Sequence, residues 1–148
     1  MQTSVNLNMN PFFAGQIIDS RNHTIESHPA DAAIGFGYGV VVGAGSDSVK
    51  LPAASTDTFR GVAVHNHKEQ AYPTAAGAAY AAGDVVPTGR VGLFGILTSK
   101  AVTKDTAAYL DPSTGKFTDS NSSTIATGGV FKTTVTAAGL STLEINLP

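Results

Sequence analysis

Two histidines separated by one residue, His65 and His67, are the side chains of this sequence best suited to binding a metal ion. Residues two apart on a β-strand share a face, so both imidazoles could reach one ion if this segment is a strand. Glu69 would lie on the same face if the strand continued, and its carboxylate would be a third ligand. A metal-dependent enzyme built on a β-barrel is therefore one hypothesis for this chain.

A second interpretation makes His65 and His67 ordinary polar side chains at the solvent-exposed end of a strand. The chain breaks soon afterwards at Pro73, and the other histidines, His23 and His28, lie in a polar segment that reads as a loop. Completing a metal site would need a further ligand from such a distant segment. We favour this second interpretation and predict neither a metal site nor a cofactor.

The other residue types give little support for catalysis. The absence of cysteine excludes thiol catalysis, disulfides and cysteine metal sites. No serine lies in a Gly-x-Ser-x-Gly motif. The aspartates stand at positions typical of turns and caps rather than of a catalytic acid pair: Asp19, Asp31, Asp47, Asp57, Asp84 and Asp111. We therefore predict a protein that is not an enzyme and has no catalytic residues.

The composition is that of a single domain with a weakly charged surface. Of the 148 residues, 14% are charged, whereas an average soluble domain has about 25%. The net charge of -2 and the lack of basic clusters argue against nucleic acid as a partner. No segment is long and apolar enough to span a bilayer, so we expect no membrane partner. The N-terminus lacks the pattern of a secretory signal.

Short apolar segments separated by turn residues predict an all-β fold, either a small antiparallel β-barrel or a jelly-roll-like sandwich. In residues 109–119, Asp111, Pro112 and Gly115 are the residue types of a hairpin turn. Alternating apolar residues predict a second hairpin at the end of the chain, over residues 128–148. Four further expectations concern a continuous strand over residues 34–43, a turn at residues 87–89, and loops over residues 21–31 and 118–127.

The N-terminal residues read as an extended arm rather than a packed element. We expect this arm to cover residues 1–15 and to precede a single β-barrel domain over residues 16–148. Pro11, Phe12 and Phe13 lie near its end, and an extended segment cannot easily bury two aromatic rings alone. The arm either clips onto a neighbouring subunit or folds back over the open end of its own barrel.

Alternating glycines mark the predicted strand over residues 34–43. Gly35, Gly37 and Gly39 leave one face of it nearly bare, and in a strand this indicates sharp curvature or the close approach of another backbone. Their spacing is not that of a phosphate-binding loop. We therefore predict a set of subunit-contact residues made of these glycines and the arm residues: Pro11, Phe12, Phe13, Gly35, Gly37 and Gly39.

The sequence resembles the small head-decoration, or cement, proteins of tailed bacteriophages. The resemblance extends over residues 11–148 and is carried by the order and spacing of several pieces rather than by one motif. These pieces are FFAGQIIDS, AIGFGYGVVVG, SVKLPAASTDTFRGVAV, AGDVVPTGRVG, AYLDPSTGKFT and LSTLEINLP.

The resemblance implies a compact β-barrel or jelly-roll-like module without enzymatic activity. Such a protein would be made in the host cytoplasm and would bind the outer surface of the phage head in the virion. There it would bridge neighbouring major capsid proteins, associating with itself as a homodimer or homotrimer. Two alternatives remain: another virion module, such as a tail or fibre subunit, and the metal-dependent enzyme that would use His65 and His67.

Overall fold

The structure is a computed structural model that describes residues 12–66 and 79–148. Every regular element in those residues is a β-strand, which confirms the all-β prediction. The strands in chain order are β1 (Thr24–Pro29), β2 (Ile34–Gly35), β3 (Gly39–Val42), β4 (Val49–Lys50), β5 (Phe59–Ala63), β6 (Ala79–Tyr80), β7 (Val85–Thr98), β8 (Ala107–Leu110), β9 (Phe117–Thr118), β10 (Ile125–Phe131) and β11 (Gly139–Asn146). None of the described residues belongs to a helix long and apolar enough to cross a membrane.

Five strands close into a barrel in the C-terminal half of the chain. They follow the order β11-β10-β8-β9-β7, and β7 pairs again with β11 to complete the ring. The predicted barrel is therefore confirmed. One pair is parallel, with Thr98 of β7 opposite Phe117 of β9, so the barrel is mixed rather than wholly antiparallel. Closure leaves this ring without the free edge that an open sheet exposes.

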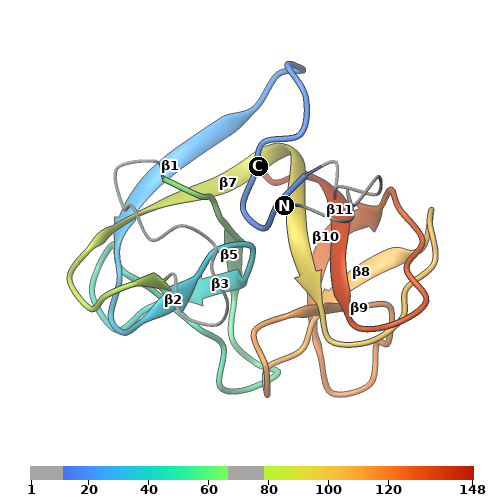
Figure 1. The fold of residues 1–148 in the computed structure, drawn as a ribbon. Helices are drawn as coiled ribbons and strands as arrows, with labels where there is room; N and C mark the ends of the chain where they lie inside the picture. The colour runs from blue at the N-terminus through green and yellow to red at the C-terminus, as the bar shows by residue number, and fades with distance from the viewer. Residues whose placement is uncertain (1–11, 67–78) are drawn as a thin grey trace, which may run out of the picture.

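Strand β7 joins the barrel to a second group of strands. Figure 1 shows β1, β2, β3 and β5 around the first half of β7 and the barrel strands β8 to β11 beside its second half. The first half of β7 pairs with β1 and β5, and its second half pairs with β11. The sheet continues from β5 to β3 and β4, while β2 and β6 form a separate small sheet.

Residues 87–89 lie inside β7, so the turn predicted there is wrong. Gly89 is opposite a residue of β1 on one side and Val62 of β5 on the other, and these flanking strands keep the segment extended. Pro87 has no N–H to donate, but its carbonyl accepts a hydrogen bond from the N–H of Val64 at 2.8 Å. The ladder therefore tolerates a proline that reads as a turn in the sequence.

The continuous strand predicted over residues 34–43 is also wrong. A turn separates β2 from β3, and in it Gly37 has a φ of 75°, which takes the chain out of the extended path. In β3 the faces of the strand still alternate, but the predicted pattern of burial fails. Val40 and Val41 are both fully buried because they face different cores, and Val42 is 40% exposed.

Both segments predicted as loops contain strand residues. Residues 21–31 hold β1, which pairs with β7, and residues 118–127 hold the start of β10, where Ile125 is opposite a residue of β8. The polar sequence concealed β1 because two of its side chains, Glu26 and His28, contact charged groups of other elements. Apolar alternation therefore gives no signal there.

The hairpin predicted over residues 109–119 is confirmed, since β8 and β9 pair antiparallel around a turn. Gly115 has a φ of 72°, and its N–H donates to the carbonyl of Asp111 at 2.9 Å. The Asp111 carboxylate accepts hydrogen bonds from the hydroxyl and the N–H of Ser113, at 2.7 and 2.9 Å. The C-terminal hairpin is confirmed as well, with Phe131 of β10 opposite Leu143 of β11.

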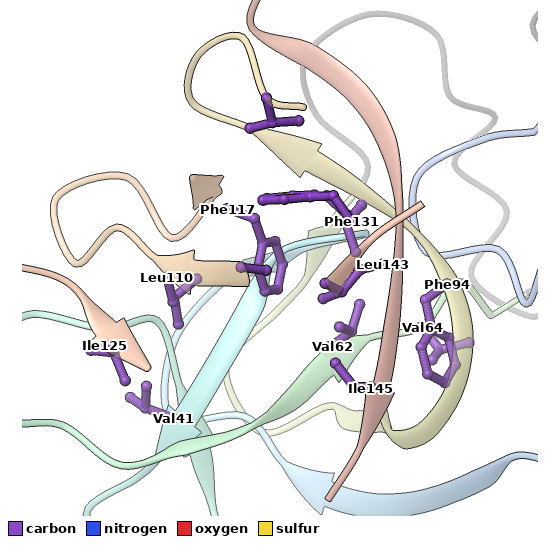
Figure 2. Packing of buried hydrophobic residues seen from close by; sticks show 13 residues of the cluster. Val41, Val62, Val64, Phe94, Leu110, Phe117, Ile125, Phe131, Leu143 and Ile145 are labelled. Atoms are coloured by element: carbon purple, nitrogen blue, oxygen red, sulfur yellow. The ribbon is translucent and has the colours of Figure 1, made fainter. Parts of the chain in front are cut away.

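Two hydrophobic cores share the strands β3 and β5. Successive side chains of β5 point to opposite sides, so Val62 belongs to the barrel core and Ala63 to the core near β2 and β6. Figure 2 shows the barrel core, in which rings such as Phe117 and Phe131 are fully buried. Burying a side chain of that size contributes roughly 1.5–3 kcal/mol. These contacts give the protein a rigid body on which surface groups are held.

Candidate functional site

The described part of the predicted arm lies along the edge of β7. Over residues 12–18 the backbone bonds to β7 much as a short strand would. The N–H of Gly15 donates to the carbonyl of Gly95 at 2.8 Å, and the N–H of Ile18 donates to the carbonyl of Leu93 at 2.9 Å. The described residues of the arm, 12–15, therefore lie against β7 of their own chain, and a contact of the arm with a neighbouring subunit stays a prediction.

Three glycines allow this segment to lie close to the rest of the chain. Gly15 belongs to the segment, and Gly37 and Gly95 face it. A Cβ on Gly95 would collide with the carbonyl oxygen of Phe13, and a Cβ on Gly37 would lie 2.9 Å from the nearest atom of the segment. A Cβ on Gly15 would lie 2.6 Å from the backbone nitrogen of His65. We call Gly15, Gly37 and Gly95 the glycine seat, because any larger residue at these positions would displace the segment.

Aromatic rings fasten the segment to the second core. The ring of Phe13 meets that of His65 edge-on with the centroids 5.0 Å apart, and Phe36 meets the same imidazole at 4.7 Å. Phe36 in turn contacts the buried ring of Tyr80 at 5.1 Å. Phe12 and Phe13 are both only partly buried, so each residue stays partly accessible to solvent. Pro11, predicted with them, lies outside the described residues.

The predicted contact glycines face groups of their own chain. A Cβ on Gly35 would lie 2.6 Å from the ring of Tyr38, and a Cβ on Gly39 would collide with Leu110. Gly37 and Gly39 are buried, and Gly35 is partly buried. The close approach expected at these glycines is therefore made within the chain, and their contact with another subunit stays a prediction.

His65 has a packing role in this structure. Its ring contacts the rings of Phe13 and Phe36, and its backbone N–H donates to the carbonyl of Gly15 at 2.8 Å. His67 and Glu69, the other residues of the possible metal site, lie outside the described residues. Within residues 12–66 and 79–148, no group of three or more histidine and acidic side chains is arranged to hold a metal ion.

The turn role predicted for the aspartates is confirmed at most positions. The carboxylate of Asp57 accepts hydrogen bonds from the N–H groups of Ala53 and Ala54 at 2.8 and 3.1 Å, and these bonds lower its pKa. Asp31 departs from the local turn role, because its carboxylate accepts from the N–H of the distant Ala44 at 2.7 Å, and this bond lowers its pKa. Comparable bonds to nearby backbone N–H groups are made by Asp19, Asp84 and Asp111.

Asp47 is different, because it belongs to a charged cluster that the sequence analysis missed. At its centre is His28, which is only 3% exposed. The other members are Glu26, Asp47, Arg60 and Arg90. These residues come from β1, the turn before β4, β5 and β7. The signal that could have found it is the i, i+2 spacing of Glu26 and His28, which places both side chains on one face of a strand.

Comparison with known proteins assigns the chain to a family. The family described as "Structural cement protein (E217 gp24/Pam3 gp6)" matches residues 1–146. The chain belongs to this phage cement protein family. The match covers almost the whole cement protein, and it confirms the resemblance seen in the order and spacing of the sequence pieces.

A solved structure shares the fold of this cement protein. It is described as "The capsid of Myoviridae Phage XM1", and one of its chains is similar with a TM-score of 0.78 and 20% sequence identity. The similarity covers 99% of this chain and 97% of that chain. At this identity the similarity establishes a common fold. Among curated proteins, the comparison found no match.

Family membership settles the broad function. The protein is a structural cement protein, a component of the phage virion that belongs to its capsid. It is therefore not an enzyme, and the hypothesis of a metal-dependent enzyme using His65 and His67 is set aside. The same assignment favours the capsid over the tail or fibre as the place where the protein acts.

Proposed function

We propose that this cement protein binds the outer surface of the phage head and bridges neighbouring major capsid proteins. The observation that carries the proposal is membership of the cement family over residues 1–146. A protein bound across a seam between subunits stabilises the closed shell by its higher affinity for that arrangement. When one molecule grips several neighbours, modest contacts gain roughly 10²- to 10⁴-fold in overall affinity.

The physical properties of the chain suit this role. A closed barrel with two packed cores is a rigid body, so little conformational entropy is lost when its surface is bound. Only 14% of the residues are charged, which keeps the cost of removing water from a contact surface low. Binding across a seam needs both properties, because each contact must keep its geometry when a force pulls the neighbouring capsid subunits apart.

For the contact site we propose the arm residues Phe12 and Phe13, together with Pro11. The two phenylalanines are held on the glycine seat and are partly exposed, which gives a fixed aromatic surface. Aromatic side chains are enriched among the residues that dominate binding energy at protein interfaces. Gly35 is also partly buried and beside Tyr38, and it is a secondary candidate.

The proposal includes self-association as a homodimer or homotrimer on the head. Self-association would multiply the number of capsid contacts that one assembly makes. Sedimentation equilibrium of the purified protein, free and with head fragments, measures this directly. A protein that stays monomeric in both conditions, while binding heads normally, would remove the oligomer from the proposal.

The experiment that tests the bridging function is reconstitution on heads that lack the protein, followed by cryo-electron microscopy. The expected result is ordered extra density over the seams between major capsid proteins, with each molecule touching more than one of them. Density confined to the centre of single capsid subunits would contradict bridging. Bare heads, when the added protein is folded, would contradict head binding altogether.

A further inference from the structure

The side chain of His28 is buried among acidic side chains. Its side chain is 4% exposed, although histidine is a polar residue and β1 lies outside the barrel. Nδ1 lies 2.9 Å from Oδ1 of Asp47 and 3.0 Å from the Asp47 carbonyl oxygen. Nε2 lies 3.1 Å from Oε2 of Glu26. Both ring nitrogens therefore face oxygen atoms that accept hydrogen bonds.

The number of protons on the ring decides how many of these bonds form. A neutral imidazole has one N–H, and an ionised carboxylate accepts hydrogen bonds but does not donate them. Neutral His28 can therefore donate to Asp47 or to Glu26, but not to both. The doubly protonated ring donates to both residues at once, and its positive charge strengthens each bond.

Two arginines complete the surroundings of the ring. Arg60 of β5 lies 3.4 Å from Asp47 and 3.8 Å from Glu26, and Arg90 of β7 lies 3.6 Å from Glu26. These guanidinium groups place opposite charge beside the two carboxylates that face the ring. They also oppose a third positive charge on His28. Because Glu26 and Asp47 are 40% and 64% exposed, water screens these longer interactions more than the hydrogen bonds to the buried ring.

We propose that His28 is a proton-dependent clamp that joins the carboxylates of Glu26, on β1, and Asp47, in the turn between β3 and β4. When both nitrogens carry protons, the ring ties Glu26 on β1 to Asp47 in that turn. Loss of one proton leaves one of the two carboxylates without the hydrogen bond from the ring. Histidine is the side chain whose protonation changes in the neutral range, so the clamp responds to pH changes that leave the barrel core intact.

The direction of the effect follows from this count of bonds. The protonated form makes one more hydrogen bond in the folded protein, so acidification within the range of histidine titration tightens the clamp. Raising the pH releases one of the two bonds that the ring makes, which lowers the stability of the charged cluster around it. The groups that set this balance are Glu26, Asp47, Arg60 and Arg90, which face His28 from β1, the turn before β4, β5 and β7.

Thermal unfolding of the full chain tests the clamp. The midpoints of the wild-type protein and of His28→Gln are compared at about pH 5 and about pH 8, the ends of the range in which histidine changes its charge. The difference between the unfolding midpoints of wild type and variant should be larger at the lower pH, by roughly 2–4 °C. This is the shift that one hydrogen bond produces in a domain of this size. His23→Gln is the matched control, since His23 is exposed and its Nδ1 contacts only the carbonyl of Arg21 among the hydrogen bonds of the described chain. Its difference from wild type should not change with pH.

A difference between wild type and His28→Gln that is equal at the two pH values, or larger at the higher one, would overturn the clamp. Because His28→Gln could prevent folding, a second measurement uses the unmodified protein. Nitrogen-15 NMR of the His28 ring is expected to show protons on both nitrogens at about pH 5 and on one nitrogen at about pH 8. A ring that keeps one neutral tautomer throughout that range would overturn the proposal independently.

Discussion

The ring of Phe13 meets the ring of His65 edge-on, with centroids 5.0 Å apart and an angle of 75° between the planes. The N–H of His65 also donates to the carbonyl of Gly15, two residues after that phenylalanine. Side chain and backbone thus attach the N-terminal segment to the chain that follows β5. The residue that looked like a metal ligand in the sequence holds the proposed contact surface in place.

This relationship predicts an energetic coupling between Phe13 and His65. In a double-mutant cycle with Phe13→Ala and His65→Ala, we expect a coupling of about 0.5–1.5 kcal/mol, the value typical of edge-to-face ring pairs. Denaturant unfolding of the four proteins measures it. The same cycle with Phe12 in place of Phe13 serves as the control and should give a smaller coupling. Equal couplings in the two cycles would contradict the specific role of the Phe13 ring.

The glycine seat predicts that Gly37→Val lowers stability. Valine would have to adopt a φ of 75°, and its Cβ would meet the segment at 2.9 Å. The left-handed conformation alone costs roughly 1–2 kcal/mol, and the collision adds to this. Gly139→Ala is the control, because a Cβ at Gly139 has no atom within 4 Å in the described structure and should change stability little. A neutral Gly37→Val would show that the segment does not need the seat.

The turn carboxylate of Asp57 predicts a loss of stability in acid. Its pKa is lowered in the folded protein by the N–H groups of Ala53 and Ala54, so the folded state favours the ionised form. Its contribution is therefore complete above the ordinary aspartate pKa of about 3.9 and is lost as the pH falls through the lower, folded value. We expect Asp57→Ala to cost roughly 0.5–2 kcal/mol at neutral pH.

The pH dependence of that cost is the decisive measurement. The difference in unfolding free energy between wild type and Asp57→Ala should shrink as the solution is acidified below about pH 4. Asp105→Asn is the control, since its carboxylate makes a surface ion pair with Lys132 at 4.0 Å, and such pairs contribute about 0–1 kcal/mol. A difference for Asp57→Ala that grows on acidification would reverse the assigned direction.

Elements held by local contacts were predictable from the sequence, whereas elements held by distant segments were not. The hairpin around Asp111 and Gly115 was predictable because its hydrogen bonds join residues within a few positions of one another. The extended path of residues 87–89 was not predictable, because β1 and β5, from distant parts of the chain, hold it straight. Turn residues indicate a turn only when no neighbouring strand pairs with them.

The candidate site shows the same limit. The sequence identified Phe12 and Phe13 as rings in need of a partner, but it could not show that His65 would be the partner of Phe13. It marked Gly37 as a point of close approach, whereas the approaching backbone belongs to the same chain. The sequence thus identifies residues that need a packing partner or close approach. The tertiary structure decides which group supplies it.

The proposed contact surface predicts that Phe12→Ala weakens head binding while leaving the fold intact. Phe12 is partly exposed, and the ring contacts that hold the segment are made by Phe13. Loss of an aromatic anchor at a protein interface typically costs at least 2 kcal/mol, or about 30-fold in affinity. Cosedimentation with heads that lack the cement protein measures this loss, and the unfolding midpoint reports the fold.

Val85→Ala is the matched control for that experiment. Val85 is the most exposed large apolar side chain of the described residues, at 59%, and it lies at the start of β7, before the part that pairs with the segment. Truncating it removes exposed apolar surface as Phe12→Ala does, but at a different position. If Val85→Ala weakens head binding and Phe12→Ala does not, the contact surface lies at the start of β7 rather than on the arm. If both variants bind like wild type, the major contacts involve neither residue.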